Sequence, residues 1–174
     1  MSRQRFVLNI SSLTLLCWHA GNLLGPARVV DGDTIVVADE KIRLHGIDAP
    51  EIGQTFWCDG REFDCGAMAA AALEALVAGI RVRCEALERD CYGRLVAKCY
   101  SPRGVDICGR LVRSGWALAY RHYSLDYVAA ENEARENFRG LWRGSFDKPW
   151  EWRSKLARSC RGELQAIPEP ATQR

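Results

Sequence analysis

The sequence has almost no excess of charge of either sign. Its 24 lysines and arginines nearly balance its 22 aspartates and glutamates, which leaves a formal net charge of +2. So small an excess gives no bulk electrostatic indication of a nucleic-acid-binding protein. Any site for an anion must therefore be built locally, from a few residues.

Histidine is also scarce, and the pattern of metal-binding residue types argues against structural zinc. His19, His45 and His122 show no spacing typical of metal ligands. Cys58 and Cys65 stand further apart than the cysteine pairs of zinc knuckles. The sequence therefore does not favour a zinc site.

The chain has no apolar run that indicates a membrane span. Residues 6–20 are mostly apolar, but this stretch is too short and too interrupted. Arg3 and Arg5 precede it, and a basic start before a short apolar run is typical of a secretory signal peptide. The alternatives are a misassigned start codon and a core-packing segment. We expect residues 1–24 to be a signal peptide or apolar segment, and the protein to be exported or retained at the membrane by this segment.

Cysteine, in contrast, is plentiful. Eight cysteines are many for a reducing cytoplasm and are compatible with an oxidising compartment. A hairpin centred on residues 90–93 places Cys84 and Cys99 opposite each other, within disulfide range. Cys58 and Cys65 bracket a short loop and form the second expected pair. The alternative is a set of reduced thiols packed in the core.

The 174 residues suffice for one domain with a sizeable core, without internal repeats or low-complexity blocks. Strands are expected at residues 27–30, 34–37, 41–47, 80–87, 94–100 and 116–120. Helices are expected at 66–79, 105–115 and 124–140, the last with Ser124 as N-cap, and a loop at 52–65. This order predicts a small α+β domain over residues 25–153, whose strands can close into an OB-like barrel or form another mixed fold. Residues 154–174 are expected to be a poorly ordered tail.

One short stretch, RLHGIDAPE at residues 43–51, concentrates charged groups. Asp48 and Glu51 lie on either side of Pro50, which fixes its own φ and favours an extended residue before it. The expected hairpin of the two preceding strands brings Asp33 beside Asp48. Two carboxylates held together repel unless a cation or proton intervenes, and oxygen ligands suit Ca²⁺ or Mg²⁺. The alternative is that these acids only shape turns.

Arg43 and Arg94 are the candidate cationic groups. Hairpin geometry points Arg43 toward the same end of the sheet as the acids, and Arg94 follows the turn DCYG. A guanidinium can bind two phosphate oxygens at once and stays charged at ordinary pH. The alternative for each arginine is a surface ion pair.

Four motifs in one order resemble the staphylococcal nuclease-like (thermonuclease) family: VVDGDTIVV, IRLHGIDAPE, DCYGRLVA and LVRSGWA. The segments GLW at 140–142 and PWEWR at 149–153 are similar to the closing segments of many members. The resemblance covers about Val29 to Arg153. It implies an OB-fold five-stranded β-barrel with about three packed α-helices. It also implies Ca²⁺-dependent hydrolysis of phosphodiester bonds in DNA and RNA, which leaves 3′-phosphates.

The resemblance assigns a metal site residue by residue. Asp33 and Asp48 match the carboxylates that bind Ca²⁺, and Ala49 matches the position whose backbone carbonyl completes the site. The type member of the family has threonine at the position of Ala49, but only the carbonyl serves as a ligand. Asp31 matches an acidic position outside the direct ligands.

The resemblance also assigns the catalytic roles. Arg43 and Arg94 match the two arginines that bind the phosphate, and Glu51 matches the proposed general base. Aromatic residues that flank the nucleotide in the family align only loosely with Tyr120 and Tyr123. The expected partner is DNA, RNA or both, bound by a monomer with no stable protein partner. The alternative is a non-catalytic OB-fold module that binds nucleic acid or protein, although every charged catalytic position is filled here.

Overall fold

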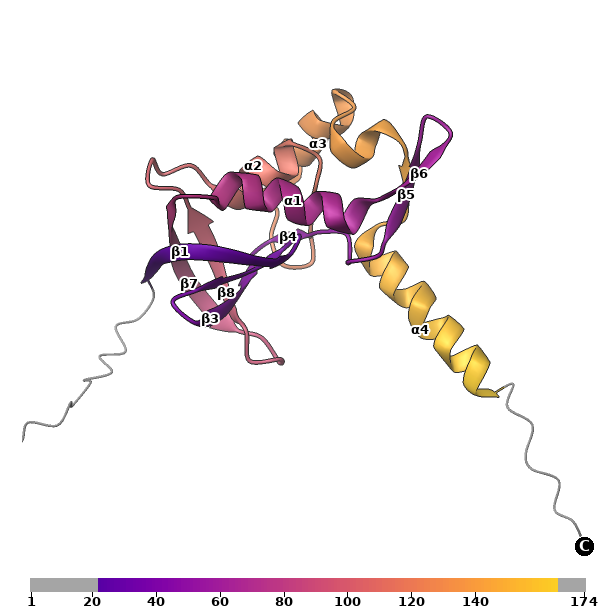
Figure 1. Ribbon diagram of the computed structural model, residues 1–174, viewed down its shortest axis with the longest axis horizontal. Helices are drawn as coiled ribbons and strands as arrows, with labels where there is room; N and C mark the ends of the chain where they lie inside the picture. Colours follow the sequence, from indigo (N-terminus) through magenta and orange to yellow (C-terminus); the bar gives the residue numbers. More distant parts are fainter. Residues whose placement is uncertain (1–21, 166–174) are drawn as a thin grey trace, which may run out of the picture.

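The chain is built on a closed five-stranded β-barrel (Figure 1). The computed structural model describes residues 22–165, and the side chains of residues 22–158. The barrel strands are β1 (Asn22–Asp31), β2 (Thr34–Val37), β3 (Glu40–Leu44), β7 (Arg81–Arg89) and β8 (Leu95–Tyr100). They close in the order β1-β2-β3-β8-β7, and only β3 and β8 run parallel. The expected α+β class and five-stranded OB-type barrel are confirmed.

Helices and short strands surround the barrel. The α-helices of the described region are α1 (Cys65–Val77), α2 (Ile107–Arg113), α3 (Val128–Glu136) and α4 (Pro149–Gln165), with a 3₁₀ turn η1 at Gly140–Arg143. The remaining strands are β4 (Ile47–Asp48), β5 (Thr55–Cys58), β6 (Arg61–Asp64), β9 (Leu118–Ala119) and β10 (Ser145–Phe146). Helix α1 lies along β1, whereas α4 projects away from the barrel (Figure 1). The structure thus has one helix more than the three expected.

The barrel core follows from the period-two pattern of its strands. Alternate residues of β2 and β3, namely Ile35, Val37, Ile42 and Leu44, are almost completely buried. Leu73 of α1 joins the same cluster. Burial of each such side chain contributes about 2 kcal/mol to folding. The β2–β3 hairpin, which carries much of the candidate site, is therefore firmly held.

Two interior segments differ from the sequence-based expectation. The expected loop of residues 52–65 contains the β5–β6 hairpin, which β10 extends into a three-stranded sheet. The third helix begins at Val128, not at residue 124. Ser124 is not its N-cap, because the Ser124 hydroxyl accepts a hydrogen bond from the Asp126 amide (3.1 Å) and shapes the turn before the helix.

Both ends of the domain are more regular than expected. Strand β1 already begins at Asn22, inside the expected N-terminal apolar segment 1–24, and Leu23 pairs with β7. Helix α4 continues to Gln165, so residues 154–165 of the expected tail at 154–174 are helical. The rest of both segments lies outside the described residues. None of the helices in the described part of the chain is both long and apolar enough to cross a membrane.

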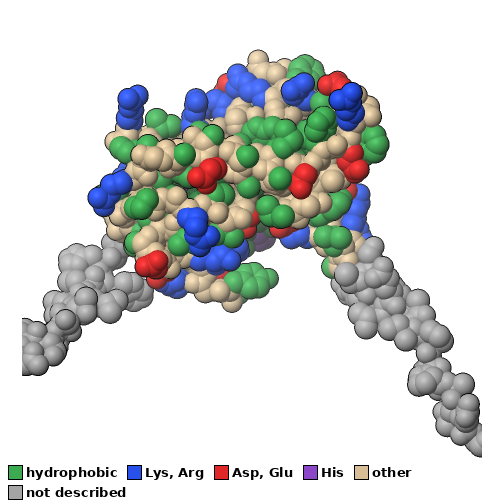
Figure 2. Space-filling view, in the orientation of Figure 1, with side chains coloured by type: hydrophobic (Ala, Val, Ile, Leu, Met, Phe, Trp, Pro, Cys, Tyr) green, Lys and Arg blue, Asp and Glu red, His purple; other side chains and the backbone are tan. Residues whose placement is uncertain are grey.

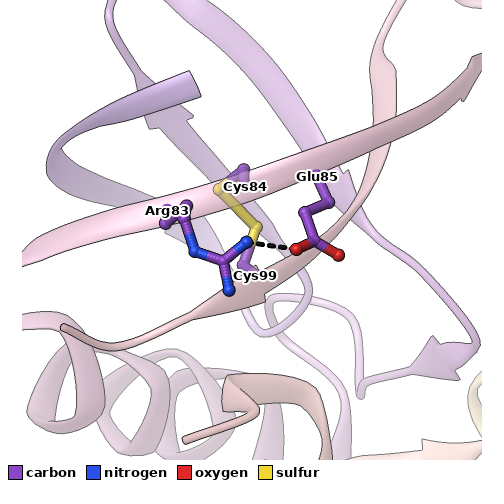
Figure 3. Close-up of a disulfide and its surroundings, with 4 residues drawn as sticks. All are labelled: Arg83, Cys84, Glu85 and Cys99. Carbon is purple, nitrogen blue, oxygen red and sulfur yellow. Dashed lines mark hydrogen bonds and ion pairs between the residues drawn. A yellow bond between two sulfur atoms is a disulfide. The ribbon is translucent and has the colours of Figure 1, made fainter. Parts of the chain in front are cut away.

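The expected disulfide between Cys84 and Cys99 is confirmed (Figure 3). The two cysteines are directly paired in the β7–β8 ladder, with Cα atoms 4.2 Å apart. Both side chains are fully buried in the barrel, and an ion pair between Arg83 and Glu85 lies beside them. The bridge therefore ties two adjacent barrel strands together.

The second expected disulfide, between Cys58 and Cys65, is wrong. Cys58 lies opposite Arg61 in the β5–β6 hairpin, whereas Cys65 starts α1 and its amide donates to the carbonyl of Gln54 (2.9 Å). The hairpin register thus places Cys58 at the turn end of the ladder and Cys65 beyond its other end. Both are buried free thiols, and the Cys65 thiol donates to the same Gln54 carbonyl (3.1 Å).

Candidate active site

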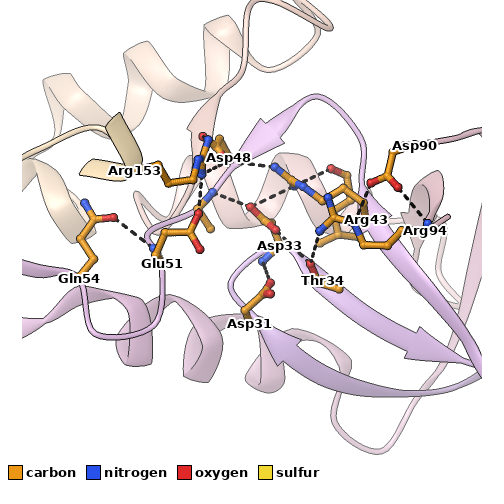
Figure 4. A network of polar contacts seen from close by, with 12 residues as sticks. Asp31, Asp33, Thr34, Arg43, Asp48, Glu51, Gln54, Asp90, Arg94 and Arg153 are labelled. Atoms are coloured by element: carbon orange, nitrogen blue, oxygen red, sulfur yellow. Dashed lines mark hydrogen bonds and ion pairs between the residues drawn. The ribbon is translucent and has the colours of Figure 1, made fainter. Parts of the chain in front are cut away.

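The charged residues singled out by the sequence surround one open cleft of about 700 Å³ at an end of the barrel (Figure 4). Its walls come from the β2–β3 hairpin, the following segment to Glu51, the β7–β8 turn and the beginning of α4. The predicted site residues that line it are Asp33, Arg43, Asp48, Glu51 and Arg94. Ala49, the sixth, is buried next to Asp33.

Asp33 is placed by a tight turn between β1 and β2. A Cβ atom on Gly32 would lie 2.6 Å from the Cβ of Ala49 and 2.9 Å from that of Ala69, so only glycine allows this close approach. The turn is closed by the Asp33 amide, which donates to Asp31 Oδ1 (3.0 Å). Close packing lets the Ala49 amide donate to Asp33 Oδ2 (2.9 Å). Asp33 is thereby fixed against the segment that carries the other acids.

The environment of Asp33 disfavours its charged form. The pKa of this carboxyl is raised to about 7, mainly by burial; the charge of Arg43 opposes the shift, and the charges of Asp31 and Asp48 add to it. A buried carboxyl with so perturbed a pKa in a cleft is typical of functional sites. A nearby positive charge or a proton is needed to stabilise it.

Arg43 supplies part of that positive charge. In the β2–β3 ladder it lies opposite Thr34, so its side chain emerges beside Asp33. Its Nη1 is 3.0 Å from Asp33 Oδ2, and its Nη2 donates to Asp48 Oδ1 (3.0 Å). The side chain is only 16% exposed, and this burial strengthens the attraction between the charges. One guanidinium therefore bridges the two predicted metal carboxylates.

Asp48 is the most buried acid of the cleft, with 1% of its surface exposed. It ends the short strand β4, where it pairs with Leu118 of β9. Besides Arg43, it binds Arg153 of α4, whose Nη2 donates to Asp48 Oδ2 (2.8 Å) and whose Nη1 donates to Oδ1 (3.3 Å). Asp48 is thus held between two guanidiniums from opposite sides.

Glu51 follows on a loop that is pinned at several points. Its amide donates to Oε1 of Gln54 (3.1 Å), a fully buried side chain whose Nε2 donates to the carbonyl of Asp147 (2.7 Å). A Cβ on Gly66 would lie 1.9 Å from the Glu51 carbonyl oxygen, so α1 packs directly on this loop. The Glu51 carboxylate is about half exposed and accepts from Arg153 Nη1 (2.5 Å). The backbone is fixed while the carboxylate faces the cleft.

Arg94 lies across the cleft on the β7–β8 turn. Its Nε donates to Asp90 Oδ2 (2.7 Å), and its amide donates to Asp90 Oδ1 (2.9 Å). Its Nη1 reaches the hydroxyl of Thr34 (3.5 Å). Burial alone raises the pKa of Asp90, but the hydrogen bonds from Arg94 lower it on balance. Asp90 therefore orients Arg94 toward the barrel end.

The chemistry of the donors fits a hard divalent cation. Asp33 and Asp48 offer carboxylate oxygens, and the Ala49 backbone lies directly beside them. Ca²⁺ accepts such oxygen ligands and completes its shell with waters and carbonyls. Within the described residues no group of three or more His, Cys, Asp or Glu side chains is arranged to hold a metal. A cation here depends on two carboxylates and non-acidic oxygens.

Sequence reasoning missed three residues that shape the cleft. In the sequence, Arg153 is only the last residue of the motif PWEWR, and neither Gln54 nor Asp90 is predicted to have a functional role. Asp90 could have been found from its place four residues before Arg94. Nothing in the local sequence indicates Arg153, because Asp48 lies 105 positions away, and the contact of Gln54 with Asp147 spans 93 positions.

Aromatic side chains also border the cleft. Tyr120 and Tyr123 both line it, with ring centroids 5.2 Å apart. The Tyr120 ring lies 5.5 Å from that of Trp150 on α4. The cleft therefore combines cationic groups with aromatic faces, a combination suited to phosphates and bases.

On the face of the molecule that Figure 2 shows, positive charge is not gathered into one broad patch. On the face shown in Figure 2, lysines and arginines are scattered among apolar and acidic side chains. This agrees with the small net charge of the sequence. The arginines of the cleft thus form a local anion site of the kind that the composition requires.

Comparison with known proteins gives consistent matches. The family described as "Staphylococcal nuclease homologue" matches residues 41–144. An "Uncharacterized endonuclease" of Escherichia coli O157:H7 is 38% identical over 156 residues, which cover 86% of this chain and 95% of that protein.

Two further relatives carry different names. A "Micrococcal nuclease" of Shigella flexneri is 34% identical over 143 residues, covering 72% of this chain and 77% of that protein. The "Succinoglycan biosynthesis protein ExoI" of Rhizobium meliloti (strain 1021) is 38% identical over 124 residues, covering 70% of this chain and 65% of that protein. The matches extend over most of the domain that carries the cleft.

Proposed function

The chain belongs to the staphylococcal nuclease family and is a hydrolytic nuclease, and from this premise we propose that it cleaves DNA, RNA or both with Ca²⁺ as cofactor. The observation that carries the proposal is the convergence of three acids and two arginines on one cleft. A phosphodiester is anionic and resists attack by water. A site that hydrolyses it must concentrate positive charge and hold a base nearby.

The acids divide into two roles. Asp33 and Asp48, with the carbonyl of Ala49, would hold the cation, which would supply positive charge to the phosphoryl oxygens. Glu51 lies on the same loop but is more exposed, so its carboxylate can accept a proton from the attacking water. Because Gln54 fixes the loop, the base keeps a defined place relative to the cation ligands.

The arginines hold the phosphate. Arg43, on the barrel floor, and Arg94, on the opposite turn, present guanidiniums that can each bind two phosphate oxygens. They favour the transition state because negative charge builds on these oxygens as water attacks. No side-chain nucleophile and no covalent intermediate are needed.

Digestion of nucleic acids by the purified protein tests this proposal. Single-stranded DNA, double-stranded DNA and RNA are incubated with the protein in Ca²⁺, in EDTA, and in EDTA followed by excess Ca²⁺ or Zn²⁺. We expect cleavage that EDTA stops and that Ca²⁺, but not Zn²⁺, restores. Binding of nucleic acid without cleavage in any of these conditions would instead favour the non-catalytic module. The products of a positive reaction also decide between DNA and RNA preference.

We further propose that the protein acts in an oxidising compartment outside the cytoplasm. Two features support this: the basic and apolar start of the sequence, and the Cys84–Cys99 disulfide. Fractionation of cells expressing the full chain tests it. Recovery of the protein in the cytoplasm, with Cys84 and Cys99 reduced, would contradict it.

A further inference from the structure

Arg153 of helix α4 lies beside the carboxylates of Asp48 and Glu51. Its guanidinium donates to both carboxylate oxygens of Asp48, at 2.8 and 3.3 Å, and to Glu51 at 2.5 Å. It is the group that joins the predicted cation ligand Asp48 to the predicted base Glu51 (Figure 4). None of the roles assigned so far requires this arginine.

Both carboxylate oxygens of Asp48 already accept hydrogen bonds from guanidiniums. Arg43 binds Oδ1, and Arg153 binds both Oδ1 and Oδ2. A divalent cation at Asp48 would be repelled by both guanidiniums, so its binding favours the departure of at least one of them. Partial burial lowers the pKa of Arg153, but its hydrogen bonds to Asp48 and Glu51 raise it on balance, so the competing group stays charged.

Arg153 is the more readily displaced of the two arginines. Its side chain is 42% exposed, against 16% for Arg43. Arg43 also bridges to Asp33 from barrel strand β3, whereas Arg153 extends from a helix that projects from the barrel. Exposed ion pairs contribute less and are exchanged more easily than buried ones.

The helix is nevertheless anchored so that Arg153 returns to the same place. Just before α4, the carbonyl of Asp147 accepts the hydrogen bond of the buried Gln54. At the start of α4, the ring of Trp150 lies 5.5 Å from that of Tyr120. These contacts keep the helix N-terminus on the loop of Glu51 while the arginine side chain can leave.

We propose that Arg153 is a positioning residue that takes the place of the divalent cation in the cation-free enzyme and leaves Asp48 and Glu51 when the cation binds. The inference rests on the proposed cation-dependent function. Displacement has two effects at once: Asp48 becomes a cation ligand, and Glu51 loses the ion pair that holds its carboxylate. Cation binding thereby releases the base for catalysis, and water is not activated at an incomplete site.

Calorimetric titration of Ca²⁺ into the substrate-free protein tests the inference without measuring activity. The proteins compared are wild type, Arg153→Gln, Arg153→Lys and Arg158→Gln. Arg158 is an exposed residue of the same helix outside the cleft lining, so its variant controls for the loss of one positive charge. The half-saturating Ca²⁺ concentration for hydrolysis is measured in parallel.

We expect Arg153→Gln to bind Ca²⁺ about tenfold more tightly than wild type. This factor corresponds to a wild-type protein in which Arg153 has left Asp48 about one-tenth of the time, and a variant in which Asp48 is always accessible. Half-saturation for hydrolysis should fall by a similar factor. Arg153→Lys should lie between the two, because an ammonium keeps the charge but lacks the planar fork. Arg158→Gln should change the affinity by less than about twofold, because exposed charges at a distance are screened by salt.

Other outcomes overturn the inference. Unchanged or weaker Ca²⁺ binding by Arg153→Gln shows that the arginine supports the ligands instead of competing with the cation. A raised KM for nucleic acid with unchanged Ca²⁺ affinity assigns Arg153 to the substrate. Equal changes of Ca²⁺ affinity in Arg153→Gln and Arg158→Gln would show that only the loss of one positive charge matters. These results leave the proposed function standing if wild type still shows Ca²⁺-dependent cleavage; absence of Ca²⁺ binding and cleavage in every protein overturns both.

Discussion

Arg43 and Arg153 contact the same carboxylate, Asp48, from opposite sides, yet they are held in different ways. Arg43 stands on a barrel strand, is mostly buried and also binds Asp33. Arg153 stands on the protruding helix α4, is more exposed and binds Glu51. The barrel side of the cleft is therefore more tightly held than the helix side. In the proposed mechanism Arg43 keeps its ion pairs throughout, whereas Arg153 leaves its partners when the cation binds.

The largest expected effect comes from Glu51, which belongs to the helix side. Glu51→Gln keeps the size and hydrogen-bonding reach of the side chain but removes its basicity. General-base catalysis contributes about 10²- to 10⁴-fold, so we expect a loss of that order in kcat. Steady-state kinetics at saturating Ca²⁺ measures it.

Ca²⁺ affinity and the binding of a nucleotide inhibitor serve as controls for Glu51→Gln and should change far less than kcat. Near-normal turnover of this variant would remove Glu51 from the role of base. Its ion pair with Arg153 would then be its main contribution to the cleft.

The comparison itself is tested by the pair Arg43→Lys and Arg153→Lys. Removal of one preorganised donor to a developing charge costs about 10²- to 10³-fold, so Arg43→Lys should lose this much in kcat/KM at saturating Ca²⁺. Arg153→Lys should lose less than about tenfold under the same conditions, because its role ends when the cation is bound. Equal losses in the two variants would show that both arginines act on the substrate and would abolish the distinction.

The stability of the barrel side should depend on its disulfide. Loss of the bridge in the Cys84→Ala, Cys99→Ala double variant should cost about 3 kcal/mol, as expected for a closed loop of 15 residues. Urea denaturation measures the free energy of unfolding. Cys91→Ala, which removes an exposed free thiol, is the matched control and should change it by less than about 0.5 kcal/mol. A double variant as stable as wild type would show that the disulfide does not stabilise the barrel.

The smallest effect is expected at Asp90, which orients Arg94. Asp90→Asn removes a partly buried ion pair of about 1 kcal/mol, so KM for nucleic acid should rise by roughly fivefold with little change in kcat. Because the folded-state pKa of Asp90 is lowered, the pair stabilises the turn at neutral pH, and this contribution disappears as the pH falls through that pKa. Wild type and variant should therefore converge in acid. A difference that persists at low pH would assign Asp90 another role.

The same contrast explains which parts of the site could be predicted from the sequence. Asp33, Arg43 and Asp48 lie on or next to one hairpin, and period-two patterning with antiparallel register brings them together. The Cys84–Cys99 bridge follows from the same kind of local register. The assignment of cation ligands and base, in contrast, came from family resemblance.

Local sequence patterns did not predict the parts of the structure that depend on a distant contact or on the strands β5 and β6. The predicted pairing of Cys58 and Cys65 is wrong because their segment forms the β5–β6 hairpin instead of a loop. Arg153 could not be placed, because the position of α4 depends on tertiary contacts such as that of Gln54 with Asp147. Residues 154–165 are largely polar, which is typical of a disordered tail, yet they are helical. They extend helix α4, whose start is already held by packing, and extending a helix is easier than starting one.

Helix α4, whose start is held by the hydrogen bond between Gln54 and Asp147, is made late during synthesis. The chain emerges from its N-terminus, so the barrel and its Asp33–Arg43–Asp48 bridge can form before α4 exists. Until residue 153 has been made, Asp48 has Arg43 but not its second guanidinium, and Glu51 lacks its ion-pair partner. Helix α4, made after the other described helices, supplies both when its start docks on the loop of Glu51.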